Sequence, residues 1–272
     1  MRAVERSAAQ AGRVRTRRAL VSPFARALSV LEAWTPQDTW LGNLELAQRT
    51  GLPTSTVTRM VQSLVQLGYL RHAPAERKYW LAPAVMALGY GAIANSDVQR
   101  AARGPMKAYA QQFGVHLHLS ERDRLDVVVL ETCTSSLLAA PPALGVGTRV
   151  GIASSPMGWA LLAALPELER YYLLENVQRR MPREWAGLSR RSSEGVSQVH
   201  QVGWCALAQS EPDVVVVATS LLVPDHPPLV LSCLGPAART TRARIERELA
   251  PRLLCIAAEI LDTCCAAPRG TP

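Results

Sequence analysis

The stretch LELAQRTGLPTSTVTRMVQSLVQLG, residues 44–68, decides the fold of the first part of the chain. It predicts a short helix over residues 44–50, which ends at a glycine suited to the left-handed region. A tight connection over residues 51–53 follows. Thr54 or Ser55 is then expected to supply the N-cap oxygen of a second helix. A helix, a glycine turn and a second helix together predict a helix-turn-helix.

The sequence on both sides of this stretch completes the pattern. Upstream, apolar residues from Ala27 to Trp34 recur at helical spacing and predict a first helix that begins after Pro23. Downstream, β-prone residues at 69–72 and 78–81 flank a short connection and predict a hairpin. Because such a hairpin is a wing, residues 23–82 are expected to form a winged helix-turn-helix domain.

The second helix of such a motif enters the major groove of DNA, where side chains near its start meet base edges. Arg59 suits a bidentate contact with guanine or a clamp on a phosphate, and Gln62 on the same face suits adenine. A solvated helix face is the ordinary alternative for any one of these residues, but the whole set favours DNA. The residues expected to contact DNA are Thr54, Ser55, Thr56, Thr58, Arg59 and Gln62 in the helix and Arg71, Arg77 and Lys78 in the wing.

The net charge of the chain, +8, is concentrated in its N-terminal third. Residues 1–82 contain twelve Lys or Arg and five Asp or Glu, whereas the rest of the chain contains eighteen and seventeen. This asymmetry favours a polyanionic partner, and nucleic acid ranks above a membrane because no basic amphipathic helix accompanies the charge. The arginine-rich residues 1–18 are expected to be a disordered arm or, alternatively, an arm that contacts DNA phosphates.

Length and composition indicate a globular protein of about two domains. Hydrophobic residues make up 48% of the 272 residues, which is enough to bury a sizeable core. No apolar run reaches the ~18 residues that a membrane span needs. The six cysteines show no C-x-x-C pair and are expected to be reduced, mostly buried thiols. We therefore expect a cytoplasmic bacterial protein, with no membrane partner, that is nucleoid-associated when bound to DNA.

The pattern of the sequence changes after residue 82. Pro83 is expected to begin a linker helix and Pro105 a further helix, and the last helix is expected to be interrupted or kinked at Pro251. From residue 115 onward, the hydrophobic pattern is typical of strands. The expected strands lie near residues 115–119, 126–131, 214–218 and 229–234. The fold class is therefore α+β, with a second domain that is α/β with an antiparallel sheet.

Several runs of this sequence resemble the IclR-type transcriptional regulators. The strongest resemblance is in residues 46–61, LAQRTGLPTSTVTRMV, and continues through Gly68-Tyr69-Leu70 and Tyr79-Trp80-Leu81. The second domain adds weaker similarities at residues 155–163 (SPMGWALLA), 203–204 (GW), 217–218 (VA) and 232–236 (SCLGP). The resemblance covers roughly residues 23–262.

The resemblance implies a winged helix-turn-helix joined by a linker helix to a GAF-like effector domain. The expected divisions are a basic disordered arm (1–22), the DNA-binding domain (23–82), the linker helix (83–103), the effector domain (104–265) and a tail (266–272). It also implies a homodimer or a dimer of dimers on a palindromic operator in double-stranded DNA, with a small-molecule effector, often a small or aromatic carboxylic acid. The effector-binding residues that it implies are Gly147, Ser155, Met157, Gly158, Trp159, Val216, Ser232 and Leu234.

The implied effector site has a physical rationale at Ser155. A helix capped by this serine would offer the unpaired amides of Met157, Gly158 and Trp159, and the positive end of the helix dipole, to a carboxylate. The alternative is that Ser155 only caps the helix and Gly158 only permits close packing.

The chain departs from the family pattern on the expected pocket wall. Gln209 stands where the family usually has an acidic residue, and Asp213 stands where it has a glycine. Val216 replaces a frequent cysteine, and Leu234 replaces a second serine. These changes predict a more apolar effector or a pocket that has lost its function.

No motif supports catalysis, a cofactor or a metal. His116 and His118 alternate onto one face of an expected strand without a third ligand nearby, so a structural role is expected. Ser154 and Ser155 lack the G-x-S-x-G elbow of a nucleophilic serine. An alternative function remains, in which a metabolite-binding or catalytic α/β domain carries a winged helix used for protein–protein contact. The basic charge of residues 1–82 favours the DNA-binding regulator.

Overall fold

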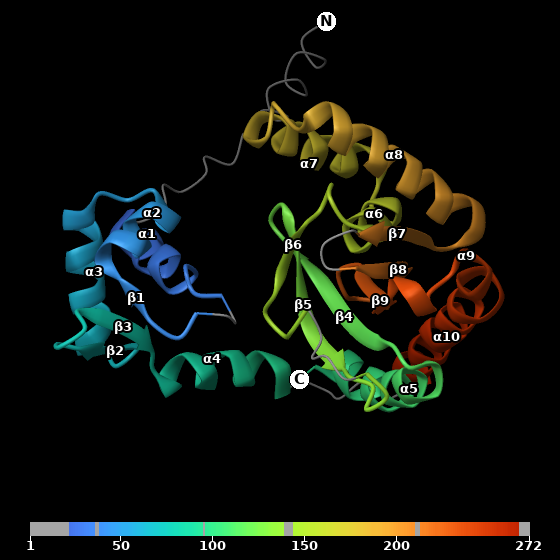
Figure 1. Cartoon of the computed structure of the whole chain (residues 1–272), viewed down its shortest axis with the longest axis horizontal. Helices are drawn as coiled ribbons and strands as arrows, with labels where there is room; N and C mark the ends of the chain where they lie inside the picture. The colour runs from blue at the N-terminus through green and yellow to red at the C-terminus, as the bar shows by residue number, and fades with distance from the viewer. Residues whose placement is uncertain (1–21, 36–37, 95, 139–143, 210–212, 267–272) are drawn as a thin grey trace, which may run out of the picture. The chain divides into compact units, whose positions relative to one another are not determined.

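The computed structural model describes residues 22–35, 38–94, 96–138, 144–209 and 213–266 (Figure 1). The chain divides into two compact units, Met1–Ala87 and Leu88–Pro272. The basic arm expected over residues 1–22 lies outside the described residues apart from Ser22. The expected tail, 266–272, lies outside them apart from Ala266.

The N-terminal unit combines helices with a small antiparallel sheet (Figure 1). Its elements are α1 (Ser22–Leu31), β1 (Leu41–Gly42), α2 (Asn43–Thr50), α3 (Thr54–Gln66), β2 (Leu70–Ala73) and β3 (Lys78–Leu81). Strand β3 pairs with both β1 and β2, with Leu41 opposite Tyr79 and Arg71 opposite Trp80. This architecture confirms the predicted winged helix-turn-helix. Strand β1 was not predicted, because two residues are too few to show a period.

The turn between α2 and α3 depends on Gly51. Its φ is +68°, in the left-handed region that favours glycine, and its amide donates to the carbonyl of Ala47. Helix α3 then begins at Thr54 with Pro53 as its N-cap and no side-chain cap. The prediction that Thr54 or Ser55 caps this helix is therefore wrong, because Pro53 already sets the entry of the chain. Both side chains are left exposed.

An apolar core and one ion pair hold the N-terminal unit together. Arg49 of α2 donates from Nη2 to Oδ1 of Asp38 at 2.8 Å and from Nη1 to the carbonyl of Ala33 at 3.0 Å. Hydrogen bonds from Arg49 and then from Thr35 hold the pKa of the Asp38 carboxyl well below its usual range. The Arg49 side chain is thus engaged in contacts that stabilise the N-terminal unit. The buried core consists of Val30, Leu41, Leu46, Val57, Val61, Leu64, Leu70 and Tyr79.

The C-terminal unit is built on a six-stranded antiparallel sheet, with the strand order β6-β5-β4-β9-β8-β7 in its described part (Figure 1). Helix α4 (Pro83–Ala94) spans the division between the units. The strands are β4 (His116–Asp123), β5 (Asp126–Cys133), β6 (Arg149–Gly151), β7 (Cys205–Gln209), β8 (Val214–Leu221) and β9 (Leu229–Pro236). The helices are α5 (Asp97–Phe113), α6 (Pro156–Ala164), α7 (Glu167–Arg180), α8 (Trp185–Val202), a short 3-10 turn (Ala237–Arg239), α9 (Arg242–Arg244), a π-helical turn (Ile245–Leu249) and α10 (Ala250–Ala266).

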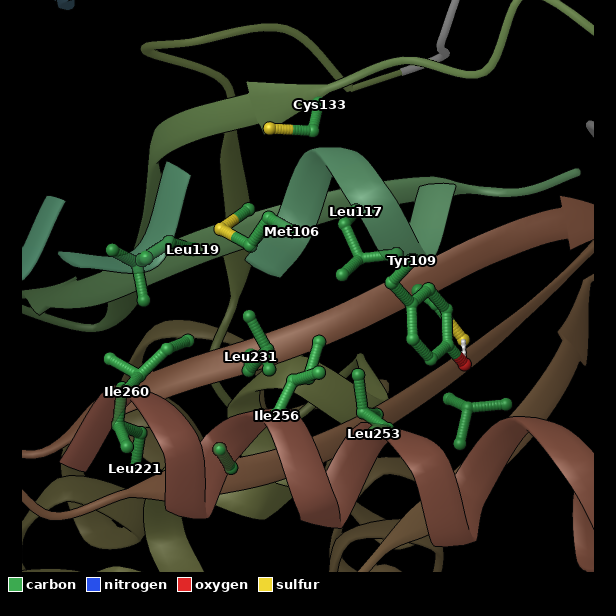
Figure 2. Packing of buried hydrophobic residues seen from close by; sticks show 14 of the residues in the cluster. Met106, Tyr109, Leu117, Leu119, Cys133, Leu221, Leu231, Leu253, Ile256 and Ile260 are labelled. Carbon is green, nitrogen blue, oxygen red and sulfur yellow. Dashed lines mark hydrogen bonds between the residues drawn. The ribbon is translucent and has the colours of Figure 1, made fainter. Parts of the chain in front are cut away.

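Helices α5 and α10 cover one face of this sheet. Figure 2 shows their apolar side chains packed against the leucines of β4 and β9. The one buried hydroxyl in this view, that of Tyr109, donates to the carbonyl of Leu249 at 2.8 Å and also contacts the sulfur of Cys233. This layer forms the larger core of the C-terminal unit.

Helices α6 and α8 cover the opposite face. Trp159 of α6 is buried, and its indole Nε1 donates to the carbonyl of Ala153 at 2.9 Å. Gly195 of α8 lies directly against the Trp159 ring, and a methyl group at Gly195 would overlap it. Gly158 lies equally close to the backbone of Ile152. The two glycines thus set how closely α6 and α8 approach their neighbours.

The structure corrects the prediction at Pro105, which lies inside α5 rather than at a helix start. The helix begins earlier because the Ser96 hydroxyl caps it by accepting from the amide of Gln99 at 3.2 Å. Near the C-terminal end, the π-helical turn Ile245–Leu249 lies just before α10, which begins at Ala250 and includes Pro251. Strand β7 was not predicted.

All six cysteines are free thiols. Cys133, Cys205 and Cys233 are buried, as expected, but Cys255 and Cys265 are exposed. The expectation of mostly buried thiols is therefore met by half of them. Burial raises the pKa of Cys205 to about 12 and of Cys233 to about 11, so these two are not reactive thiolates.

We predict that Gly195→Ala lowers the free energy of unfolding of the C-terminal unit by about 1–3 kcal/mol, because the added methyl group overlaps the Trp159 ring. Gly187→Ala on the same helix is the matched control. Its added methyl group meets nothing within 4 Å, so it should stabilise the helix by about 0.5–1 kcal/mol. Urea unfolding followed by circular dichroism measures both, and equal effects would contradict the close approach at Gly195.

Candidate DNA-binding surface and effector site

Helix α3 presents a polar face at its start and along one side. Thr54, Ser55, Arg59 and Gln62 are exposed. Within the described residues, the Arg59 guanidinium has neither a hydrogen bond nor an ion pair, and it contrasts in this respect with the engaged Arg49 of α2. A cation held on a rigid helix without an internal partner is free to meet a base edge or a phosphate.

The remaining predicted residues of α3 are partly turned inward. Thr56 and Thr58 are half-buried. The Thr58 hydroxyl donates to the carbonyl of Thr54 at 2.9 Å and accepts from Nδ2 of Asn43 at 3.2 Å. Thr58 therefore links α3 to the start of α2, and its contact with DNA stays a prediction.

The wing presents the other predicted cations. Arg71 on β2 is exposed, and Arg77 lies in the connection before β3 with a φ of +51°. The wing sheet is stiffened by aromatic contacts, since Trp80 lies 4.4 Å from Trp40 between ring centroids and Tyr79 stacks on His72. The two wing strands and their connection thus carry the exposed Arg71 and Arg77 and the half-buried Lys78.

Two of the three amides that were expected to be free at the start of α6, those of Gly158 and Trp159, have internal partners. The amide of Gly158 donates to the Ser155 hydroxyl at 3.1 Å, and the amide of Trp159 donates to the Ser155 carbonyl at 3.0 Å. Both are thus engaged in capping the helix. Gly158 also permits a close approach to Ile152. The expected carboxylate contact with these two amides is corrected by the structure, because internal partners already use them.

The predicted wall residues from the strands lie on the face of the sheet that α6 covers. Val216, Ser232 and Leu234 are buried among the apolar residues of this layer, and Val216 stands opposite Leu234 in the pairing of β8 with β9. Gly147 lies in the loop before β6 with a φ of +84°. The structure therefore brings the strand residues together but leaves Gly147 in a separate loop.

The same face carries a polar cluster that was not predicted as a group, although His118 was expected to be structural and Ser232 to bind the effector. His118 of β4 stands opposite Ser232 of β9 and opposite Thr132 of β5, and Ser120 lies two residues further along β4. His118, Ser120 and Ser232 are fully buried. Nδ1 of His118 lies 3.2 Å from the Thr132 hydroxyl. The sequence indicates this cluster through HLHLS, residues 116–120, where polar residues alternate with leucines in a strand that has a core on each side.

Within the described residues, three atoms of this cluster have no hydrogen-bond partner: Nε2 of His118, Oγ of Ser120 and Oγ of Ser232. Leaving a buried polar group unpaired costs about 1–3 kcal/mol each. Burial, and next the neighbouring His116, lower the pKa of His118 from 6.5 to about 3. The cluster is therefore uncharged near neutral pH.

A cavity of about 390 Å³ lies on the same side of the C-terminal unit. Its walls are mainly apolar, with Ile152 and Ala153 from the segment before α6 and Val177 and Met181 from α7 and its end. Arg180 also lines it and has no ion pair among the described residues. None of the predicted effector residues lines this cavity, although it borders the segment that leads to Ser155.

Neither a metal centre nor a membrane span is found in the part of the chain that the structure describes. Its His, Cys, Asp and Glu side chains form no group of three or more able to hold a metal ion. None of its helices combines the length and apolar character needed to cross a membrane.

The N-terminal unit defines the class of protein, a winged helix-turn-helix regulator. A model of the IclR helix-turn-helix domain matches residues 24–74. The transcriptional regulator TsaQ1/TsaQ2 of Comamonas testosteroni is 30% identical over 237 residues, which are 86% of this chain and 85% of that protein. An IclR-family regulator from Brucella abortus matches the structure with a TM-score of 0.81 and 32% identity, over 95% of this chain and 97% of that one. This chain belongs to the IclR family of transcriptional regulators.

A further structural neighbour is an IclR homologue from Microbacterium hydrocarbonoxydans complexed with 4-hydroxybenzoate. It has a TM-score of 0.66 and 22% identity, and covers 90% of this chain and 100% of that one. At this identity the likeness shows the shared fold. The relatives reported above are regulators, which supports a regulator over the catalytic alternative.

We predict that Arg59→Ala weakens binding to the specific operator by about 5- to 150-fold, the equivalent of the ~1–3 kcal/mol of one good bidentate base contact. Arg190→Ala removes the same charge from an exposed helix of the C-terminal unit and is the control. Fluorescence anisotropy with labelled operator measures both. Equal losses in the two variants would show that Arg59 acts only through net charge.

We predict that His118 makes stability depend on pH between about 6.5 and 3. Because its pKa is lower in the folded chain, only the unfolded chain binds the proton in this window. The contribution of His118 to the free energy of unfolding is fully present above pH 6.5. It falls by up to about 1.4 kcal/mol for each pH unit below that value. Urea unfolding from pH 7 to pH 4 should show a smaller loss in His118→Gln than in wild type. His200→Gln, which removes an exposed histidine, should keep the wild-type slope.

Proposed function

We propose that this regulator binds a specific operator through α3 and the wing and that a small molecule bound by the C-terminal unit changes this binding. The observation that carries the proposal is the exposed Arg59 on α3 of a winged helix-turn-helix, which has no partner among the residues that the structure describes. Ser55 and Thr56 would hold phosphates, and Gln62 would address a base on the same helix face as Arg59. Arg71, Arg77 and Lys78 would reach the flanking backbone.

The distribution of charge supports a role for the N-terminal arm in this binding. Residues 1–22 contain six arginines and one glutamate, so they carry +5 of the +7 of residues 1–82. The winged helix itself is only weakly basic. Non-specific attraction to phosphates would therefore come mainly from the arm, and specificity would come from α3.

The proposed active form is a homodimer or a dimer of dimers. Helix α4 carries Met86, Leu88 and Tyr90 on its surface, and each is more than 60% exposed. Exposed apolar side chains at this density on one helix favour contact with a second copy. A symmetric dimer would bind a palindromic operator, because two equivalent recognition helices meet two equivalent half-sites.

The proposed effector is a small or aromatic carboxylic acid bound between the segment 147–158 and the face of the sheet that α6 covers. The cavity beside this segment supports the proposal, since its walls are mainly apolar and Arg180, which lines it together with Asp126, could pair with a carboxylate. The 4-hydroxybenzoate bound by the homologue is an aromatic acid of this kind. An effector that binds one arrangement of the dimer more tightly than another would favour that arrangement and so shift the spacing of the recognition helices.

The test is a fluorescence-anisotropy titration against the DNA that flanks this protein's own gene. If each protomer neutralises about 4 phosphates, the slope of log affinity against log salt should be near −7 for a dimer, since each contact contributes about 0.9. The same chain without residues 1–18 should give a shallower slope and keep its preference for the operator. A slope near zero for the full chain would overturn DNA binding.

The effector part is tested by repeating the titration with a panel of aromatic and aliphatic acids. One acid should change the affinity for the operator by about 5- to 150-fold, the usual range of coupling between two sites. Arg180→Gln should weaken the response to that acid, and Arg179→Gln on the same helix is the control. Tight DNA binding that no acid alters would overturn the effector proposal and leave the regulator itself intact.

A further inference from the structure

Strand β4 places two kinds of side chain on its two faces. Leu117 and Leu119 point into the core formed with α5 and α10. The alternate residues, His118 and Ser120, therefore face the layer of α6, because side chains along a strand alternate between faces. That layer is otherwise apolar around them, with Val129 and Val230 opposite Ser120. Two polar residues in such a position are unusual for a buried strand.

Ser232 extends this polar group onto the next strand. It is the residue opposite His118 in the β4–β9 pairing, and Ser120 is its diagonal neighbour. Directly opposite residues on one face bring their Cβ atoms to about 4.5–5.5 Å, and diagonal neighbours remain within reach of a shared small group. His118, Ser120 and Ser232 are thus three buried polar side chains of two adjacent strands, gathered on one face.

The unpartnered atoms of this group form a matched set of donors and acceptors. Both serine hydroxyls can donate and accept, and Nε2 of His118 does one or the other according to its tautomer. Buried polar atoms of this kind are normally satisfied by the protein, by an ordered water or by a ligand. No protein atom in the described residues satisfies them, so they are available to a ligand that displaces any water held there.

The chemistry of the site selects an uncharged partner. The side chains that pack in this layer are apolar, and His118 is neutral near pH 7. A buried carboxylate without a cation would be strongly disfavoured here. A hydroxyl group suits the site best, since it both donates and accepts.

We infer that His118, Ser120 and Ser232 form a specificity site for a hydroxyl group, or a similar uncharged polar group, of the small-molecule effector. This inference rests on the proposed function, because it assumes that the C-terminal unit binds an effector. It adds that the effector carries such a group apart from its carboxylate, and that this group enters the layer between β4, β9 and α6. Leu234 and Val216 would then contact its apolar part.

The test uses the full chain and two matched pairs of probes, benzoate with 4-hydroxybenzoate and phenylacetate with 4-hydroxyphenylacetate. Titration calorimetry with wild type should show that at least one hydroxylated probe binds about tenfold or more tightly than its partner, because a site built for a hydroxyl discriminates against its absence. Ser120→Ala/Ser232→Ala should remove this preference and leave the non-hydroxylated probe unchanged. Ser193→Ala/Ser197→Ala, which removes two hydroxyls from an exposed part of α8, should keep it.

A second readout does not depend on the choice of probe. In the ligand-free chain, Ser120→Ala/Ser232→Ala should leave the melting temperature unchanged or raise it, since it removes hydroxyls that lack partners. A lower melting temperature would overturn the inference, because it would show that structural waters or protein groups already bind these hydroxyls.

The outcomes separate the inference from the proposed function. If the probes bind but the hydroxylated ones show no preference, or the preference survives in Ser120→Ala/Ser232→Ala, the hydroxyl site is overturned and effector binding stands. If no probe binds and no acid alters operator affinity, effector binding itself is overturned, and the inference is overturned with it because it rests on that function.

Discussion

The close approach of α6 to its surroundings is the constraint on which the C-terminal unit depends. Gly158 lies against the backbone of Ile152, and Gly195 of α8 lies against the Trp159 ring, so neither position tolerates a side chain without a shift. Trp159 is further fixed by its hydrogen bond to Ala153. With α6 held in this way, the inner face of β8 and β9 is closed by a rigid helix. Any ligand on that face must fit the space that the helix leaves, and this is how packing sets specificity.

Much of the N-terminal unit could be predicted from the sequence because its signals are local. Gly51 in a short connection between two periodic segments requires a left-handed turn, and the structure has one. The N-cap of α3 was predicted wrongly because Thr54 and Ser55 are good capping residues, yet Pro53 takes the position and leaves them exposed. The prediction that a helix begins at Pro105 was wrong for a similar reason. A proline favours the first turn of a helix, but α5 begins earlier, at the Ser96 cap, and continues through the proline, which cannot donate a backbone hydrogen bond there.

The effector region could be predicted only in part, because its geometry depends on contacts between distant strands. The resemblance identified Ser155 and Gly158, but it could not show that Ser155 itself uses the amides of Gly158 and Trp159. The loss of polar groups at Val216 and Leu234 suggested an apolar wall. Strand pairing places Ser120 and His118 beside Ser232, which restores polar groups on the same face from another strand. That compensation cannot be seen until the register of β4 against β9 is known, because Ser232 lies 114 positions after its partner His118 in the sequence (232 − 118).

Strand β4 also connects the proposed ligand site with the core that packs against α5. A group bound to His118 and Ser120 acts on one face of β4, and the opposite face carries Leu117 and Leu119 against α5. Densely packed cores of this kind transmit small displacements, because side chains cannot adjust without moving their neighbours. Helix α5 follows α4 in the chain after the cap at Ser96, and α4 carries the exposed apolar residues proposed for the dimer contact. An effector would therefore influence DNA binding only if it prefers one position of β4 and α5 over another, since equal affinity for both positions shifts no equilibrium.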